Sequence, residues 1–181
     1  MTEFTPIQTE RLLIVPFSDE HLSERYVGWL NDAEVVRFSE QRHRSHSLES
    51  CKAYWKSFDG SPHYFWAVVE KEGQPGHIGN MNAYVDRNNG VADVGILIGE
   101  KSVWGKGYGL EAWIAVCNYL FSHVQIRKIT AGALSTNTRM VRLMNHAGMS
   151  QECRRIRQAL FEGDYVDVVH YSLFNDEQRM D

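Results

Sequence analysis

The residues best suited to chemistry form a glycine-rich segment at 103–112, with the sequence VWGKGYGLEA. Its three glycines alternate with other residues, so the backbone can approach a ligand closely and turn its N–H groups toward it. The apolar helical pattern that follows adds the unpaired N–H groups and the positive end of a helix N-terminus. Such a turn binds phosphate or pyrophosphate, and Lys106 adds a cation. The segment therefore predicts an anion-binding turn.

Two other interpretations of this glycine-rich segment are possible. One is a tight turn with no ligand, although three spaced glycines then cost backbone entropy. The other is a dinucleotide site, because Gly107, Gly109 and Ala112 fit the pattern G-x-G-x-x-G/A. That site needs an acidic residue about 20 positions later to hold a ribose, and residues 112–151 contain no Asp or Glu. We reject the dinucleotide site and retain a pyrophosphate loop for coenzyme A.

The acid-free segment 112–151 also shows that charge is unevenly distributed along the chain. The 181 residues carry a net charge of −4, but residues 112–151 carry +4 and the remainder therefore −8. Charge sorted this way indicates an anionic ligand beside the basic segment. A buried segment would also lack acids, and charge alone favours neither explanation. The cations of the window are Arg127, Lys128, Arg139 and Arg142.

Composition limits the class of protein. With 43% hydrophobic and 23% charged residues, the chain is typical of one globular domain over 1–181. It has three widely spaced cysteines, which argues against disulfides and zinc sites. We therefore expect no metal site and a location in the reducing cytoplasm. No apolar run reaches the ~20 residues that span a bilayer, so no membrane is expected. Residues 1–6 show no secretion signal, and the acidity argues against a nucleic-acid partner.

Hydrophobic periodicity predicts the elements that position the turn. Helices are expected at 19–30 with Ser18 as N-cap, at 48–58, over about 15 residues after the glycine-rich turn, and at 138–147. Residues 39–47 are polar and predict a loop. Strands are expected at 10–17, 63–70, 77–85, 91–99, 128–134, 149–160 and 165–174. The predicted fold is α+β, with a mostly antiparallel six- to seven-stranded sheet flanked by helices.

Several short motifs together resemble a known family. They are WGKGYG at 104–109, TERL at 9–12, WLND at 29–32, IGE at 98–100, and Asn137 with Gly148 eleven residues later. This combination resembles the GNAT N-acetyltransferases, and within them the branch of RimJ/RimL type that acetylates ribosomal-protein N-termini. The family loop reads Q/R-x-x-G-x-G/A, so Trp104 replaces the usual Gln or Arg, a common form in that branch.

The resemblance implies a GNAT fold and acetyl-CoA as cosubstrate. In this family the strand before the loop parts from its neighbour and pairs with the pantetheine arm, which assigns Leu97, Ile98 and Gly99 to the cofactor. Asn137 matches an asparagine that contacts the cofactor, and it also fits a plain helix N-cap. Arg139 and Arg142 are candidates for the nucleotide phosphates, or a solvated helix face. The implied loop residues are Trp104, Gly105, Lys106, Gly107, Tyr108, Gly109 and Leu110.

Acetyl transfer to an amine needs a neutral amine, a stabilised oxyanion and a protonated leaving thiolate. An α-amine, with a pKa near 8, loses its proton more easily than a lysine. Asp93 occupies the strand position where many family members carry a glutamate base, and it also fits a solvent-facing strand residue. Glu40, with His43 and His46, lies in the polar loop expected to roof the acceptor site.

One position departs from the family pattern. Many members carry a tyrosine seven residues after the asparagine, which protonates the thiolate, and Met144 stands there in this chain. Ser135, Tyr108 or water could serve instead. A non-catalytic coenzyme A-binding module is therefore the alternative to an enzyme.

The amine acceptor is less well defined. Trp66, Asn80, Asn82 and Tyr84 lie on strands expected to border the acceptor channel, although aromatic residues there are more often core. Residues 34–42 resemble those of acetyltransferases that act on amino-sugar nucleotides. A protein or peptide N-terminus and an amino sugar both stay open, followed by a small amine. A homodimer through an edge strand or the closing hairpin stays open as well.

Overall fold

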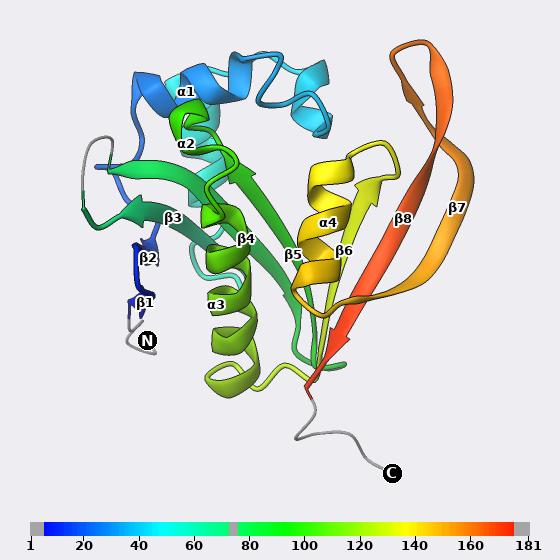
Figure 1. Cartoon of the computed structure of the whole chain (residues 1–181). Helices are drawn as coiled ribbons and strands as arrows, with labels where there is room; N and C mark the ends of the chain where they lie inside the picture. The colour runs from blue at the N-terminus through cyan, green and yellow to red at the C-terminus, as the bar shows by residue number, and fades with distance from the viewer. Residues whose placement is uncertain (1–5, 73–75, 176–181) are drawn as a thin grey trace.

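A computed structural model describes residues 6–72 and 76–175, so residues 1–5, which bear on the secretion signal, lie outside the description. Within these ranges eight strands form one sheet, in the order β1-β2-β3-β4-β5-β6-β8-β7 (Figure 1). All neighbours are antiparallel except β5 and β6. The strands are β1 (Ile7–Gln8), β2 (Leu12–Pro16), β3 (Tyr64–Glu70), β4 (His77–Asp86), β5 (Val91–Ile98), β6 (Lys128–Leu134), β7 (Ser150–Phe161) and β8 (Asp164–Phe174). The α+β prediction is confirmed, and the two-residue β1 joins the seven expected strands.

The four α-helices lie where the periodicity placed them, except for the start of the first, and two short 3-10 helices were not predicted, one of them within the expected loop 39–47. They are α1 (Glu24–Asn31), η1 (Glu40–His43), α2 (Leu48–Lys56), η2 (Lys101–Val103), α3 (Tyr108–Ser122) and α4 (Thr138–His146). The predicted start at residue 19 with Ser18 as cap is wrong, because the Ser18 N–H donates to Nδ1 of His21 in a turn. Ser23 caps α1 instead, accepting from the N–H of Tyr26. None of the described helices is long and apolar enough to cross a membrane.

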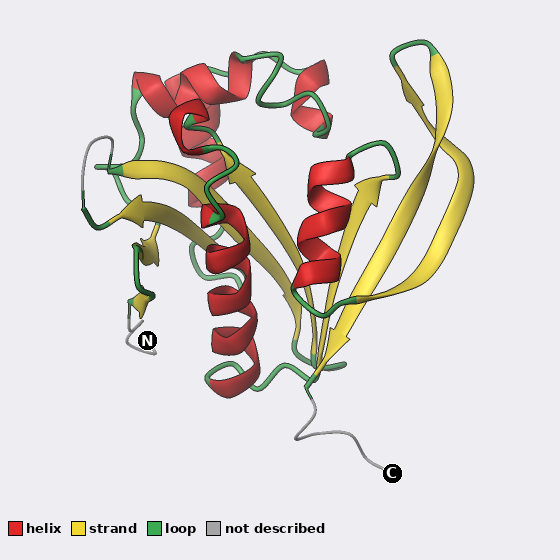
Figure 2. Cartoon of the chain, in the orientation of Figure 1, coloured by secondary structure: helices red, strands yellow, loops and turns green. Residues whose placement is uncertain are grey.

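Helices pack around the sheet (Figure 2), and buried side chains form two apolar clusters. On one face, Trp113 and Leu120 of α3 pack against the sheet with neither side chain exposed. Trp66, a candidate for the acceptor channel, belongs to this cluster and is 1% exposed, so it is a core residue. On the other face, Trp29 of α1 and Trp55 of α2 pack in the second cluster. Both faces are therefore covered at β2 and β3, whereas Asp93 of β5 and most of β7 are exposed.

The parallel pair at the centre of the sheet separates along its length. Only residues 91–93 of β5 pair with residues 128–130 of β6. Beyond that point β5 stays paired with β4 as far as Ile98, and β6 stays paired with β8 as far as Leu134. Each strand thus follows its antiparallel neighbour, and a V-shaped split opens between residues 94–98 and 131–134 (Figure 1). This split positions the candidate site.

Candidate functional site

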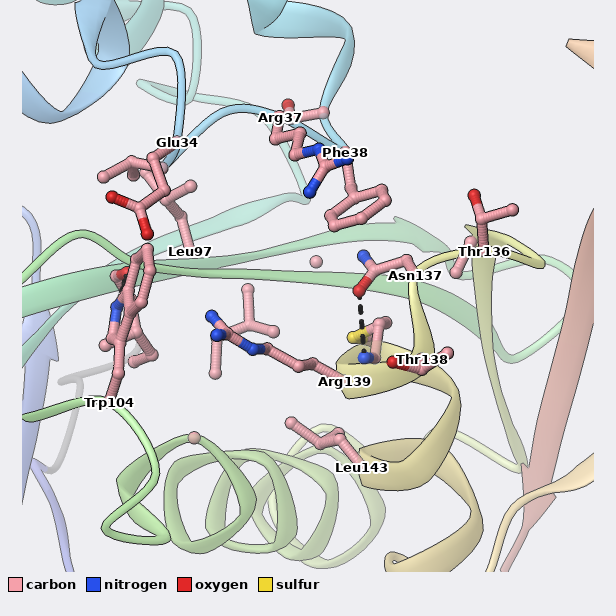
Figure 3. A pocket seen from close by; sticks show the side chains of 18 of the residues that line it. Glu34, Arg37, Phe38, Leu97, Trp104, Thr136, Asn137, Thr138, Arg139 and Leu143 are labelled. Atoms are coloured by element: carbon pink, nitrogen blue, oxygen red, sulfur yellow. Dashed lines mark hydrogen bonds between the residues drawn. The ribbon is translucent and has the colours of Figure 1, made fainter. Parts of the chain in front are cut away.

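A cleft of about 1000 Å³ occupies the split between β5 and β6. One wall is β5, and the glycine-rich turn with the start of α3 closes one end. The start of α4, residues 34–39 and the turn between β7 and β8 complete the lining. In Figure 3, Arg37 and Phe38 lie across the cleft from Leu143, and Trp104 faces Arg139. Four segments far apart in the sequence therefore meet around one space.

The glycine-rich turn presents backbone to this cleft. Gly105 and Gly107 adopt positive φ angles of 77° and 86°, which other residues rarely adopt. Gly107 is the N-cap of α3, and no side chain caps this helix end. The N–H groups of its first turn have no partner within the helix, so they and the positive dipole end are available to an anion. The turn therefore has the form expected of a phosphate site.

Glu111, in the first turn of α3, is the acidic residue nearest this anion site, and the start of the chain neutralises it. The Thr9 hydroxyl and the Arg11 N–H donate to Glu111 Oε1, at 2.5 and 2.9 Å. An ion pair of 2.6 Å joins Arg11 Nη2 to Oε2. Burial acts to raise the pKa of Glu111, but these hydrogen bonds outweigh it and lower the pKa. Arg11 also donates to the Lys106 carbonyl, which ties the TERL motif to the turn.

Trp104 and Arg139 connect the turn to α4. The Trp104 indole N–H donates to the Ile98 carbonyl at 2.8 Å, which fixes the ring at the end of β5. The Arg139 guanidinium lies 4.9 Å from the centre of that ring, a cation–π contact (Figure 3). A fixed cation thus lies in the cleft beside the uncapped end of α3. Trp104, which stands where the family pattern has Gln or Arg, thus provides the ring that Arg139 contacts.

The residues considered for proton transfer lie in different surroundings. Asn137 lines the cleft, and its side chain caps α4 by accepting from the Met140 N–H at 3.2 Å. Met144 is fully buried in the core. The Tyr108 hydroxyl donates to the Glu70 carboxylate, a bond that raises the Tyr108 pKa. Met144 has no proton to donate, and the Tyr108 hydroxyl donates its proton to Glu70, so neither Met144 nor Tyr108 serves as an acid in the cleft.

Asp93 and Glu40 differ in their surroundings. Asp93 accepts a hydrogen bond of 2.7 Å from the Thr130 hydroxyl, where β5 and β6 part. Part of Asp93 is exposed, but neighbouring groups crowd its carboxyl; this burial raises the pKa of Asp93, against the lowering effect of Thr130. The Glu40 side chain is 76% exposed and pairs with Arg42, outside the cleft lining.

The structure brings most of the predicted cofactor residues together. Gly99, Lys106, Leu110 and Arg142 do not line the cleft. Gly99 has a packing role, because a Cβ there would lie 2.1 Å from the Trp29 ring. The predicted residues that do line it are Leu97, Ile98, Trp104, Gly105, Gly107, Tyr108, Gly109 and Asn137.

Four cleft-lining residues were not among the predicted site residues, although two of them lie in the segment 34–42 that resembles amino-sugar acetyltransferases. We call them the strap: Arg37, Phe38, Phe161 and Glu162. Arg37 donates to both carboxylate oxygens of Glu162, at 2.8 and 2.9 Å. The Phe38 and Phe161 rings stack with centroids 5.2 Å apart. These contacts join the segment before η1 to the β7–β8 turn, 125 residues away, so only the tertiary fold reveals them.

The fold has counterparts in known proteins. Residues 11–150 match the family model of the acetyltransferase (GNAT) domain. The chain belongs to the GNAT acetyltransferases. The prediction of an N-acetyltransferase is thereby confirmed.

Related proteins and structures share the same architecture at low identity. An N-acetyltransferase of Bacillus licheniformis designated p20 is 23% identical over 172 residues, covering 95% of this chain and 83% of that protein. The structure of RimL, a ribosomal L7/L12 α-N-protein acetyltransferase in complex with coenzyme A, superposes with a TM-score of 0.83 at 14% identity, covering 95% of this chain and 99% of that one. Spermidine N-acetyltransferase from Vibrio cholerae, with CoA and spermine, gives 0.81 at 16% identity, covering 92% and 96%. At these identities the structural likeness establishes the fold.

Proposed function

We propose that this GNAT protein transfers the acetyl group of acetyl-CoA to a primary amine, by direct attack of the amine on the thioester. The acceptor is a protein or peptide N-terminus or an amino sugar, and we place the protein in the RimJ/RimL-type branch. One observation carries the proposal. The split between β5 and β6 ends at an uncapped helix N-terminus with a glycine-rich turn and Arg139 beside it.

The described residues fit coenzyme A along the whole cleft. The turn and the first N–H groups of α3 suit its pyrophosphate, and Arg139 adds positive charge. From residue 94 onward, β5 has no strand partner on its β6 side. Its backbone groups there can pair with an extended chain that contains amides, as pantetheine does. Acetyl-CoA would supply an activated acetyl thioester at the open side of the split.

The side chains support attack without a dedicated acid. Backbone N–H groups of β5 in the split can stabilise the oxyanion. Asp93 lies where the strands part, outside the cleft lining, and we assign it to favouring loss of the amine proton through its negative charge. Because Met144 is apolar and buried, the thiolate leaves without help from that position. A thiol with a pKa near 8.5 is an adequate leaving group on its own.

An acceptor panel tests the proposal. The protein is incubated with acetyl-CoA and, separately, an alanine-starting peptide, a 4-amino sugar and spermidine, and thiol release and product mass are measured. We expect the peptide or the amino sugar to gain one acetyl group with matching release of thiol. Tight binding of acetyl-CoA with no transfer to any amine would contradict the proposal and favour the non-catalytic binding module.

A further inference from the structure

A second polar group lies beside Asp93, on the sheet face opposite α3. Ala92 and Val94 belong to the apolar cluster under α3, so Asp93 between them points to the other face. The same alternation places Thr130 of β6 and His170 of β8 on that face, because their neighbours Ile129, Ala131, Val169 and Tyr171 are in the α3 cluster. Three adjacent strands thus present an aspartate, a threonine and a histidine together.

Two cleft-lining glycines lie next to this group and allow neighbouring side chains to pack closely against the backbone. Gly95 and Gly132 are each two residues beyond the last paired position of β5 and β6, and both line the cleft. A Cβ at Gly95 would lie 2.7 Å from the Asn82 Oδ1 atom. A Cβ at Gly132 would lie 3.3 Å from Cε1 and Nδ1 of His170. His170 is not itself in the cleft lining, but because Gly132 has no side chain, the imidazole lies directly against this residue of the cleft wall.

The His170 ring has an unusual environment. It lies opposite Gly132 in the β6–β8 register, with the Nδ1–Cε1 edge toward that glycine. Its Nε2 atom is buried and has no hydrogen-bond partner among the described residues. A buried polar atom without a partner is rare and costs free energy, so it calls for a functional explanation. Burial raises the pKa of Asp93, and the nearby His170 acts in the opposite direction, so the two side chains interact electrostatically.

We propose that His170 accepts the proton of the attacking amine at its Nδ1 edge, and that Asp93 stabilises the imidazolium that forms. This assignment rests on the acetyl transfer proposed above and adds a catalytic residue that the sequence motifs did not indicate. Other histidines considered for this role fit less well. The His43 side chain is 62% exposed and lies 4.0 Å from Glu40. His46 also has a buried Nε2 atom without a partner among the described residues, but it follows η1 and lies on neither strand of the split.

The proposed step balances in atoms and charge. The amine nitrogen bonds to the thioester carbonyl carbon, the C–S bond breaks, and the proton leaving nitrogen passes to His170. His170 returns that proton, through water, to the thiolate, so that an amide and a free thiol result. Asp93 stays ionised and holds no proton in the cycle. A positioned base of this kind typically contributes 10²–10⁴-fold to the rate.

Substitution with chemical rescue tests the assignment in the full chain, with the amine that the panel identifies. We expect His170→Ala to lower kcat/KM for the amine by about 100-fold, with the Kd of acetyl-CoA within twofold of wild type. Added imidazole should restore part of the rate, because the removed ring leaves space next to Gly132. The control His146→Gln changes an exposed histidine at the end of α4 and should keep full activity.

The outcomes separate the two proposals. If wild type transfers acetyl groups and His170→Ala keeps its rate within threefold, the assignment of His170 is wrong and the acetyl transfer stands. Loss of activity together with loss of acetyl-CoA binding, without imidazole rescue, also overturns the assignment, since it indicates a structural role. A wild-type protein that acetylates no amine overturns both proposals.

Discussion

Arg139 and Arg142 lie on the same helix, yet only Arg139 lines the cleft. We expect Arg139→Ala to weaken acetyl-CoA binding by about tenfold, because it removes a charge-assisted contact worth about 1.5–3 kcal/mol. Arg142→Ala, the matched control, should change the Kd less than twofold. Titration calorimetry with acetyl-CoA measures both. Equal losses in the two variants would show a general charge effect instead of a defined contact.

His77 makes a second residue-level prediction, on stability. Its ring lies 5.1 Å from the rings of both His21 and Trp29, and burial lowers the pKa of His77 to about 3. The unfolded chain takes up this proton near pH 6.5. The folded state resists protonation of His77. The contribution of His77 to the free energy of unfolding is therefore complete above pH 6.5, and it is lost as the pH falls toward 3, by up to about 1.4 kcal/mol per pH unit.

Urea unfolding between pH 7 and 4.5 measures this effect. His77→Gln should flatten the pH dependence, while His123→Gln, at an exposed position after α3, should leave it as in wild type. Identical slopes for wild type and His77→Gln would contradict the assignment to His77.

Single elements were predictable from local patterns, and their mutual contacts were not. Alternation and turn signals located the seven longer strands, because those signals lie within each segment. The start of α1 was missed, because two serines could each cap it and a contact with His21 decides between them. The strap was missed for another reason. Its halves are 125 residues apart and meet only through the fold.

Gly99 shows how an element contact sets a residue type. At this position just after β5 a Cβ would lie 2.1 Å from the Trp29 ring. We expect Gly99→Ala to lower the free energy of unfolding by about 1–3 kcal/mol through overpacking against α1. Gly28→Ala is the control, because nothing lies within 4 Å of its Cβ site and alanine favours a helix. Chemical denaturation compares them; equal stabilities would contradict the close packing.

The strap gives a prediction about the acceptor. Its ion pair is largely exposed, so Arg37→Ala should leave the melting temperature nearly unchanged. The variant should raise the KM of the amine severalfold without changing that of acetyl-CoA, because the pair borders the cleft away from the glycine-rich turn. Arg154→Ala, which removes another ion pair of the same hairpin, is the control. Steady-state kinetics test both, and equal KM values in the two variants would argue against a role of the strap.

At the scale of the whole molecule, the charge sorting has two causes. Part of residues 112–151 is acid-free because it is core, as Trp113 and Ile129 show. Of its four cations, Arg139 alone lines the cleft, while Lys128 pairs with Glu152 beyond the split. The sequence therefore predicted the glycine-rich turn that lines the cleft, and the positive window contributed one lining residue. The acceptor end that we propose involves the strap and His170, whose contacts join segments far apart in the sequence.

The central claim is that the split between β5 and β6 binds acetyl-CoA, and thermal unfolding with and without acetyl-CoA tests it most directly. A ligand that binds only the folded state at 100 times its Kd adds about 2.7 kcal/mol. For a domain of this size the melting temperature should then rise by roughly 5–10 °C. Arg139→Ala should need a higher concentration for the same rise. An unchanged melting temperature at millimolar acetyl-CoA would contradict the claim.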